Sequence, residues 1–298
     1  MINYHKPVLI TEVVDSFKSI LHIDNPTGKE KRTIIDATLG TAGHAIALAK
    51  AGFKVVGIEA DASTLEVARK RIESEGQTIK TFNANFINLE TILRDNDLKT
   101  ADGILFDLGV NILQLRSVYR GMSFENPNAR LDMRIARIGP TGADLLNLLR
   151  YDQLVALFAR VLKTKEAKII AARVAEKRKT KLFKRVGDLT TLVKGVVHKA
   201  RINDATLPLM ALRIAVNSEL ENLQEVLPKA YNLLKSDGAL LVIVFHSGED
   251  EIVTDYFMKI KSMFPNTTLI GPILPSRIEV SKNKSARSAK LRILIKNE

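Results

Sequence analysis

Apolar positions in the first third of the chain follow two alternating periods. Short β-branched runs, such as TIIDATL at residues 33–39, are typical of buried strands, and each is followed by apolar residues at helical spacing. Strands that alternate with helices predict a parallel, doubly wound α/β sheet. The predicted strands cover residues 33–39, 54–59, 79–83 and 102–108, and the predicted helices cover residues 44–51, 60–75 and 86–94.

This alternation stops after the fourth strand. Residues 110–142 are rich in loop-forming residues, and residues 143–201 carry helical spacing with few strand signals. The sheet pattern then resumes, so we expect a Rossmann-like domain of residues 1–110 and 206–298, interrupted by an inserted all-helical domain of residues 111–205. The later predicted helices are 143–162, 165–179, 187–200, 209–235 and 250–262, and the later predicted strands are 239–245 and 291–295.

The formal net charge of the chain is +12, and two short stretches carry the excess. Residues 160–201 hold 14 basic and 3 acidic side chains and residues 277–298 hold 7 and 2, whereas residues 1–159 are neutral. Clustered Lys and Arg side chains neutralise phosphates, so this distribution favours a nucleic-acid partner over a merely solvated helix face. A membrane surface is a weaker alternative, because the basic stretch lacks an aromatic interfacial face.

Composition excludes several other classes. The chain contains no Cys, which excludes disulfides and thiolate metal sites and favours a reducing compartment. No apolar run approaches the roughly 20 residues that a transmembrane helix needs, and the amino-terminal segment lacks the apolar core of a signal peptide. The five His residues show no metal-ligand spacing. We therefore expect a cytoplasmic protein without a metal site.

Candidate ligand-binding residues follow the predicted strands, because parallel sheets bind ligands at the carboxyl ends of their strands. Gly40 and Gly43 follow the first strand, where glycines would let the backbone approach a ligand closely. Glu59 ends the second strand, where an acid can accept hydrogen bonds from the ribose of an adenosine cofactor. Asp107 ends the fourth strand and would face the same crevice. The spacing G-x-x-G differs from the dinucleotide fingerprint G-x-G-x-x-G, which favours S-adenosylmethionine over NAD.

Several separate motifs together resemble one family, the bacterial small-subunit (16S) rRNA cytosine-N4 methyltransferases known as RsmH or MraW. The matches run from residue 5 to residue 292 in the family's order, which makes the resemblance specific. It implies a Rossmann-like, class I S-adenosylmethionine-dependent methyltransferase sheet with a helical insertion after the fourth strand. The matching stretches are His5–Leu9, Asp36–Gly40, Gly43-His44, Asn85-Phe86, Asp102–Val110, Gln114-Leu115, Arg120–Phe124, Leu131–Arg134, Ala211–Ile214 with Asn217, Glu219-Leu220, Phe245–Ser247 with Glu249-Asp250, and Arg287–Arg292.

The resemblance also implies site residues, with Phe86 packing on the adenine of S-adenosylmethionine. The chain departs from the family pattern in two places. In its glycine-rich loop two of the family's glycines are replaced, so that the loop reads Gly40-Thr41-Ala42-Gly43, and at Asn111-Ile112 the family has two serines. These departures are compatible with a diverged member, a paralogue with another RNA target or a weakened enzyme. The cofactor positions implied by the resemblance are Gly40, Ala42, Gly43, His44, Glu59, Phe86, Asp107 and Gln114.

The amine of cytosine is a poor nucleophile, because its nitrogen lone pair is delocalised into the ring. A hydrogen-bond acceptor on the enzyme that holds one N–H of this amine would orient the lone pair for methylation. Asp107 is the first candidate acceptor, and the side-chain carbonyl of Asn111 is the second. Asp132 and His246 are further candidates for the catalytic crevice, although His246 could equally be a hydrogen-bonded structural residue. Arg134 could pair with Asp132 or contact a phosphate.

The two basic stretches are expected to hold an RNA backbone while the crevice selects the base. The base must leave its stack to be methylated, and Tyr119 or Phe124 could stack on it. The expected partner is small-subunit ribosomal RNA or the small ribosomal subunit, and a homodimer is left open. The predicted RNA-binding residues are Arg173, Lys177, Arg178, Lys179, Lys181, Lys184, Arg185, Lys284, Arg287 and Lys290.

Two other functions are compatible with these patterns. A non-catalytic or weakened ribosome-assembly factor on the same fold would bind RNA without measurable cofactor affinity, and the changes at Thr41 and Ala42 favour it. An NAD-dependent oxidoreductase would bind NAD in place of S-adenosylmethionine. Binding measured with both cofactors side by side separates the three hypotheses.

Overall fold

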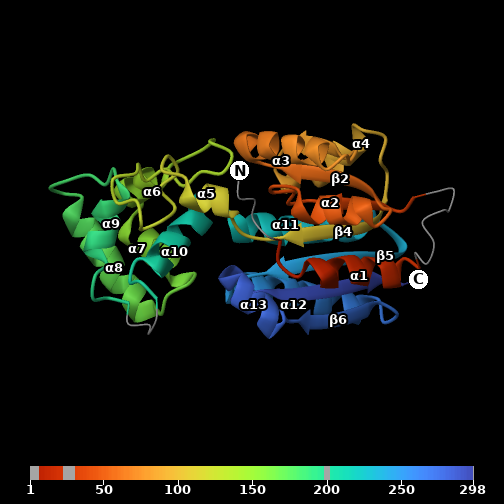
Figure 1. The fold of residues 1–298 in the computed structure, drawn as a ribbon. Coiled ribbons are helices and arrows are strands. Elements are labelled where there is room, and N and C mark those ends of the chain that lie inside the picture. The colour runs from red at the N-terminus through yellow and green to blue at the C-terminus, as the bar shows by residue number, and fades with distance from the viewer. Residues whose placement is uncertain (1–6, 23–30, 198–201, 298) are drawn as a thin grey trace. The chain divides into compact units, whose positions relative to one another are not determined.

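A computed structural model describes residues 7–22, 31–197 and 202–297 (Figure 1). The chain divides into two compact units, residues 1–109 with 220–298 and residues 110–219, which we name the sheet unit and the helical unit. His5 and the end of the predicted helix 187–200 lie outside the described residues. In the part of the chain that is described, no helix combines the length and apolar character required to cross a bilayer.

The sheet unit is built on seven strands in the order β3-β2-β1-β4-β5-β7-β6. The pairs from β3 to β5 are parallel, and β7 runs antiparallel to both β5 and β6. The predicted parallel α/β sheet is therefore confirmed. The strands are β1 (Thr33–Asp36), β2 (Lys54–Glu59), β3 (Lys80–Asn83), β4 (Ala101–Asp107), β5 (Leu234–Val244), β6 (Thr268–Ile273) and β7 (Lys290–Lys296).

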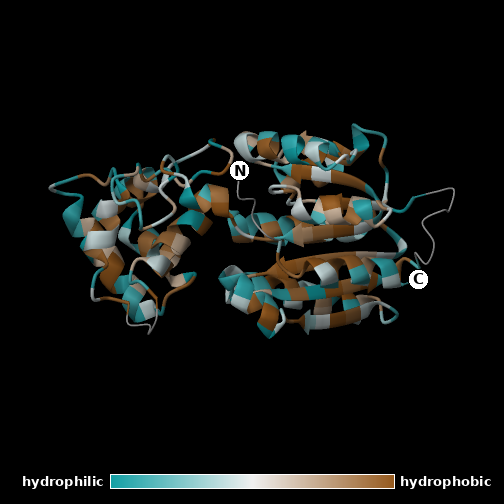
Figure 2. Cartoon of the chain, viewed as in Figure 1, coloured by the Kyte–Doolittle hydropathy of each residue, from teal (hydrophilic) through white to brown (hydrophobic). Residues whose placement is uncertain are grey.

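Successive side chains on each strand point to opposite faces, so the sheet supports two apolar cores. On β1, Ile34 packs into one core and Ile35 into the other. Because both faces are buried, the central strands are nearly continuous apolar runs, and they are mostly brown in Figure 2. The first face is covered by α1 (Ile10–Ile20), α2 (Gly43–Lys50) and α3 (Ala62–Ser74), and the second by α4 (Leu89–Arg94), α11 (Glu219–Leu233) and α12 (Ser247–Met263).

The remaining short helices of the sheet unit are η1 (Phe86–Asn88), α13 (Arg277–Lys282) and η2 (Lys284–Ser288). The helical unit has its own apolar core, whose large buried side chains include Phe158, Ile170 and Phe183. A separate core of this kind is what an independently packed insertion requires. Its helices are α5 (Ile112–Arg116), α6 (Gly142–Leu148), α7 (Tyr151–Ala159), α8 (Thr164–Lys177), α9 (Val186–Leu192) and α10 (Thr206–Asn217).

The structure corrects two of the predicted helices. The predicted helix 209–235 is two helices, α10 and α11, because Ser218 adopts a left-handed conformation with φ 49°. The predicted helix 143–162 is also two, α6 and α7, with an extended Leu149-Arg150 between them. Helix α10 packs in the helical unit, so this unit ends at Glu219. The sequence analysis had ended the inserted domain at residue 205.

Candidate active site

Four carboxyl side chains lie at the carboxyl edge of the sheet. Asp36, Glu59 and Asp107 end β1, β2 and β4, and Glu249 lies in the first turn of α12, which follows β5. Their charges are close enough to interact, because Asp36 raises the pKa of both Glu59 and Asp107, and Glu249 also raises the pKa of Asp107. The ends of β1, β2 and β4 therefore lie close together, with Asp36 near both Glu59 and Asp107.

The loop after β1 is held against β2 by Glu59. One carboxyl oxygen of Glu59 accepts a hydrogen bond from the Gly40 N–H at 2.9 Å, and the other accepts one from the Asp61 N–H at 2.8 Å. Gly40 has φ 53°, which glycine adopts without strain. Ala42 has φ 64°, which is strained for a residue with a β-carbon.

The structure gives a packing reason for glycine at position 43. A β-carbon there would lie 2.9 Å from Cγ of Pro7, so the residue makes room for the amino-terminal segment of the chain. The same segment contacts His44, whose Nε2 lies 2.9 Å from the Val8 carbonyl oxygen. Because a carbonyl only accepts, Nε2 carries a hydrogen and the Nδ1 edge of the ring faces the sheet edge.

Asp107 meets that Nδ1 edge. Its Oδ2 lies 3.4 Å from Nδ1 of His44, and its backbone N–H donates to Oγ1 of Thr38 at 2.6 Å. Its other carboxyl oxygen, Oδ1, is buried and has no hydrogen-bond partner among the described residues. A buried carboxyl oxygen without a partner is costly, and such an atom is expected where a ligand donates a hydrogen bond.

Burial dominates the electrostatics of the cluster. Removal from water raises the pKa of Asp36 to about 7 and that of Glu59 to about 7, and it raises the pKa of Asp107 well above its usual value. No Lys or Arg within the described residues forms an ion pair with these three acids. The cluster therefore favours a cationic ligand.

Phe86 stands in η1 after β3, where its ring packs edge to face on Phe106, with ring centroids 5.6 Å apart. The ring is partly exposed, so one side remains available to an apolar ligand surface. Strand-end acids that pair with no Lys or Arg of the described residues, a loop with two left-handed residues and a half-buried aromatic ring fit a nucleoside that carries a positive charge, as S-adenosylmethionine does. No group of three potential metal ligands occurs in the described part of the chain.

His246 caps the amino terminus of α12. Its Nδ1 accepts from the Glu249 N–H at 3.4 Å, and a Glu249 carboxyl oxygen accepts from the Phe245 and His246 N–H groups at 2.8 and 3.2 Å. This reciprocal arrangement is a capping box. The structure gives His246 this positioning contact, so its strand-end location alone does not indicate catalysis.

Asn111 and Gln114 form a second reciprocal cap, in the helical unit. The Asn111 side-chain oxygen Oδ1 accepts from the Gln114 backbone N–H at 3.0 Å, and the Gln114 side-chain oxygen Oε1 accepts from the Asn111 backbone N–H at 3.1 Å. Gln114 is buried. The carbonyl expected to contact a cytosine amine is thus engaged in starting α5.

Asp132 forms a two-point ion pair with Arg134, with both N···O distances at 2.8 Å. The hydrogen bonds from Arg134 lower the pKa of Asp132, so this carboxyl stays ionised. Arg120 is buried nearby and donates to the Arg134 and Ile135 carbonyls at 2.6 and 2.9 Å. The loop that contains Asp132 and Arg134 is therefore held together by these hydrogen bonds.

The basic stretch of the helical unit divides into two kinds of side chain. Arg173, Lys177, Arg178 and Arg185 donate to backbone carbonyls of the unit, at distances between 2.6 and 3.3 Å. Lys179 pairs with Glu176 at 2.8 Å, and Lys181 with Asp188 at 3.5 Å. The first four side chains therefore stabilise the fold directly. The sequence analysis grouped them with the exposed cations because it counted charge alone.

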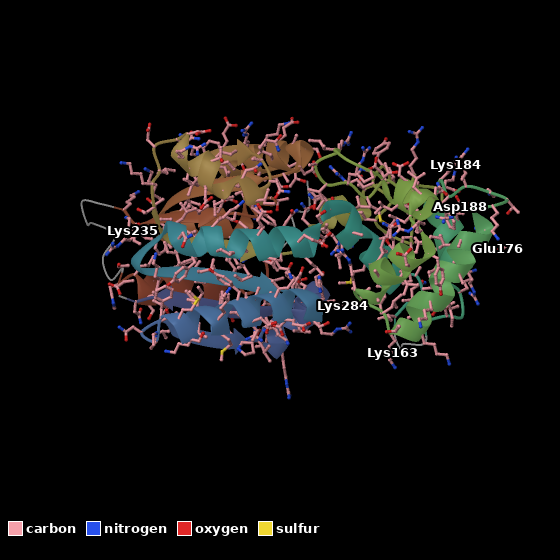
Figure 3. The ribbon with its side chains drawn as sticks, turned by 180° about the vertical axis from the view of Figure 1, so that it is seen from behind. Lys163, Glu176, Lys184, Asp188, Lys235 and Lys284 are labelled. Carbon is pink, nitrogen blue, oxygen red and sulfur yellow. The ribbon has the colours of Figure 1, made fainter. Side chains whose placement is uncertain are left out.

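Lys184 belongs to the second kind. Its ammonium group is exposed and makes no ion pair or hydrogen bond within the described residues, and Lys163, at the start of α8, is likewise exposed (Figure 3). In the sheet unit, Lys284 and Arg287 are exposed on η2, whereas Lys290 pairs with Asp250 at 2.7 Å. Exposed cations of this kind can contact phosphates without breaking internal contacts.

Sequence reasoning did not select Asp36, Glu249 or Val8 as site residues. Asp36 carried a signal, because it ends a predicted strand in the manner of Asp107. Glu249 stood in a matched motif without an assigned role. The Val8 carbonyl has no side-chain signal, since its contact with His44 joins backbone and ring across 36 positions.

These features define a Rossmann-like α/β domain with a site for a nucleoside cofactor at the carboxyl edge of its sheet. A family model described as the MraW methylase family matches residues 3–297, so the chain belongs to the MraW methylase family. This confirms the family predicted from the motifs, and with it the methyltransferase type of sheet carrying a helical insertion.

The relatives share most of their length with this chain. A ribosomal RNA small subunit methyltransferase H from Dictyoglomus thermophilum is 35% identical over 294 residues, covering 97% of this chain and 95% of the relative. A protein of the same name from Methylacidiphilum infernorum is 39% identical over 257 residues, covering 85% and 77%. The solved structure of a putative rRNA-methylase from Clostridium thermocellum is 12% identical, with a TM-score of 0.48 over 98% of this chain and 99% of that one.

Proposed function

We propose that the protein is an S-adenosylmethionine-dependent methyltransferase that acts on the N4 amine of a cytosine in small-subunit ribosomal RNA. The observation that carries the proposal is the acid cluster around Asp107, whose buried Oδ1 lacks a partner, in a chain that belongs to a methylase family along its whole length. The names of the relatives support ribosomal RNA as the substrate, and with that substrate we propose a cytoplasmic location.

The sheet unit offers groups for each part of the cofactor. Glu59 would accept hydrogen bonds from the ribose, the backbone around Gly40 and His44 would line the loop side, and the partly exposed ring of Phe86 would pack on the adenine. When bound there, S-adenosylmethionine supplies an electrophilic methyl group on a cationic sulfur. The uncompensated acids of the cluster stabilise that positive charge.

Asp107 is the residue we assign to the acceptor base. A hydrogen bond from one amine N–H to Oδ1 would hold the base in place and orient the nitrogen lone pair, which otherwise remains delocalised in the ring. After methylation the nitrogen must lose one proton. Asp107 can accept it, and the Nδ1 edge of His44 lies 3.4 Å from Oδ2 to share it.

The exposed cations would hold the RNA backbone. Lys184 on the helical unit and Lys284 and Arg287 on η2 are available for phosphate contacts, and they would contribute affinity without selecting the base. Among the described residues, Arg178 and Arg173 are engaged by backbone carbonyls, so we propose structural roles for them.

A non-catalytic RNA-binding paralogue is the second candidate. Its specific support is Ala42, which holds a left-handed conformation in the cofactor loop and thereby adds strain where a glycine would add none. Such a protein would bind small-subunit RNA and would leave S-adenosylmethionine unbound.

The deciding experiment incubates the protein with labelled S-adenosylmethionine and under-methylated small ribosomal subunits, and then locates the label by nucleoside mass spectrometry. We expect N4-methylcytidine from the wild type and a loss of roughly 100-fold or more in the Asp107→Asn variant. The matched control is Glu90→Gln on α4, an exposed carboxyl at which full activity is expected. RNA binding with no label transferred by the wild type would favour the assembly factor.

A further inference from the structure

The cofactor loop contains two left-handed residues on either side of Thr41. Gly40 has φ 53° and Ala42 has φ 64°. The loop is fixed at its start by the Leu39 N–H, which donates to the Ile58 carbonyl at 2.9 Å, and by the Gly40 N–H, which donates to Glu59. Since Ala42 carries a β-carbon, its backbone would relax towards ordinary φ values unless something holds it.

Arg71, on α3, holds the middle of this loop. Its guanidinium Nη1 donates to the Thr41 carbonyl oxygen at 3.0 Å and lies 3.3 Å from Thr41 Oγ1. Thr41 is buried, with 5% of its surface exposed, so water does not readily replace the guanidinium. A charged donor at a buried carbonyl is among the stronger hydrogen bonds in proteins.

We infer that Arg71 is a positioning residue for cofactor binding. By fixing Thr41 it keeps Ala42 left-handed, and it thereby keeps the Gly40 N–H on the carboxyl group of Glu59 that is proposed to bind the ribose. None of the family motifs in the sequence includes Arg71. The inference rests on the proposed function, because it describes how this chain tolerates Ala42 in the cofactor loop.

The inference makes Arg71 and Ala42 energetically dependent on each other. Removing the guanidinium should free the loop while Ala42 is present. With glycine at position 42 the left-handed conformation is no longer strained, so the clamp should matter less. A contact that merely stabilised the fold would show no such dependence on residue 42.

The test compares Arg71→Met, Arg71→Lys and the double variant Arg71→Met with Ala42→Gly. The dissociation constant for S-adenosylmethionine is measured by calorimetry, and kcat and KM are measured with under-methylated small subunits. The matched control is Arg69→Met on the same helix, because Arg69 contacts Thr81 on β3 and not the loop. Thermal melts of every variant monitor folding.

We expect Arg71→Met to weaken S-adenosylmethionine binding about tenfold or more. The KM for S-adenosylmethionine should rise accordingly, with little change in kcat. Arg71→Lys should lose less, and Ala42→Gly in the Arg71→Met background should restore most of the affinity. Arg69→Met should bind as the wild type does.

The outcomes separate this inference from the proposed function. If the wild type bound no S-adenosylmethionine, both would be wrong. If the wild type bound and methylated while Arg71→Met and Arg71→Lys kept its affinity, only the role of Arg71 would be wrong. A failure of Ala42→Gly to restore binding would likewise reject the positioning role. Should Arg71→Met not fold, the comparison of Arg71→Lys with and without Ala42→Gly decides the question in the same way.

Discussion

Replacing Asp36 with asparagine should stabilise the ligand-free protein at alkaline pH. Asp36 ends β1 with 1% of its surface exposed, and its Oδ1 accepts from the Thr38 N–H at 3.2 Å, a contact that an asparagine carbonyl can keep. Burial raises the pKa of this carboxyl to about 7. The Ala45 N–H also donates to Asp36. The substitution therefore removes a buried charge and keeps the side-chain shape and one carbonyl acceptor for these donors.

The sign follows from proton linkage. The folded state holds the Asp36 proton more tightly than the unfolded state, so this group favours folding most at low pH, and its contribution is lost as pH rises from 3.8 to about 7. A rise of that size corresponds to about 4 kcal/mol at about 1.4 kcal/mol per pKa unit. About two pH units of this range lie between pH 5 and the folded-state pKa of about 7. The unfolding free energy of Asp36→Asn relative to the wild type should therefore be about 3 kcal/mol larger at pH 8 than at pH 5.

Urea denaturation at pH 5 and pH 8, without ligand, measures the effect as the change in unfolding free energy. The control is Glu73→Gln, an exposed carboxyl on α3, for which the difference from the wild type should be the same at both pH values. If Asp36→Asn also differed from the wild type by the same amount at both values, Asp36 would not be the buried, high-pKa acid that the structure describes.

Four further predictions each concern a single residue. Arg178→Met should destabilise the helical unit by about 2 kcal/mol in thermal unfolding, because Arg178 donates to two carbonyls at the end of α6. Lys184→Ala should weaken RNA binding without changing stability. Gly121→Ala should prevent proper folding, seen as a lost cooperative melt, because its β-carbon would lie 2.0 Å from the Arg130 carbonyl oxygen. The rate of methylation should rise with pH as Asp107 loses its proton, and a rate independent of pH would contradict the assignment of Asp107 as base.

The fold was predictable from sequence wherever burial on both faces gave the strands a clear apolar run. Strand β6 was missed because it is an edge strand with exposed positions and contains Gly271-Pro272, which does not look like a strand. The break between α10 and α11 was missed because Leu212, Val216 and Leu220 keep helical spacing across Ser218. Periodicity reports which residues are buried, and a single left-handed residue can redirect a helix without disturbing it.

The site was predictable to the extent that strand ends determine it. Glu59 and Asp107 were selected because parallel strands present their carboxyl ends together. The contact of His44 with the Val8 carbonyl could not be foreseen, since it depends on tertiary packing of the amino-terminal segment. Charge counting had a different limit, because it cannot distinguish Arg178, which is engaged by carbonyls, from Lys184, which is exposed.

The acid cluster links stability to ligand preference. Ionising Asp36, Glu59 and Asp107 in the ligand-free protein costs free energy, because the first two are buried, Asp107 is largely removed from water, and no Lys or Arg of the described residues pairs with them. A cationic ligand relieves that cost, and an uncharged ligand of the same shape does not. Methyl transfer converts a sulfonium into an uncharged thioether, so the electrostatics that would draw S-adenosylmethionine into this site would hold its product less tightly. Under the proposed function, the carboxyl edge of the sheet would match the charge of the methyl donor as well as its nucleoside.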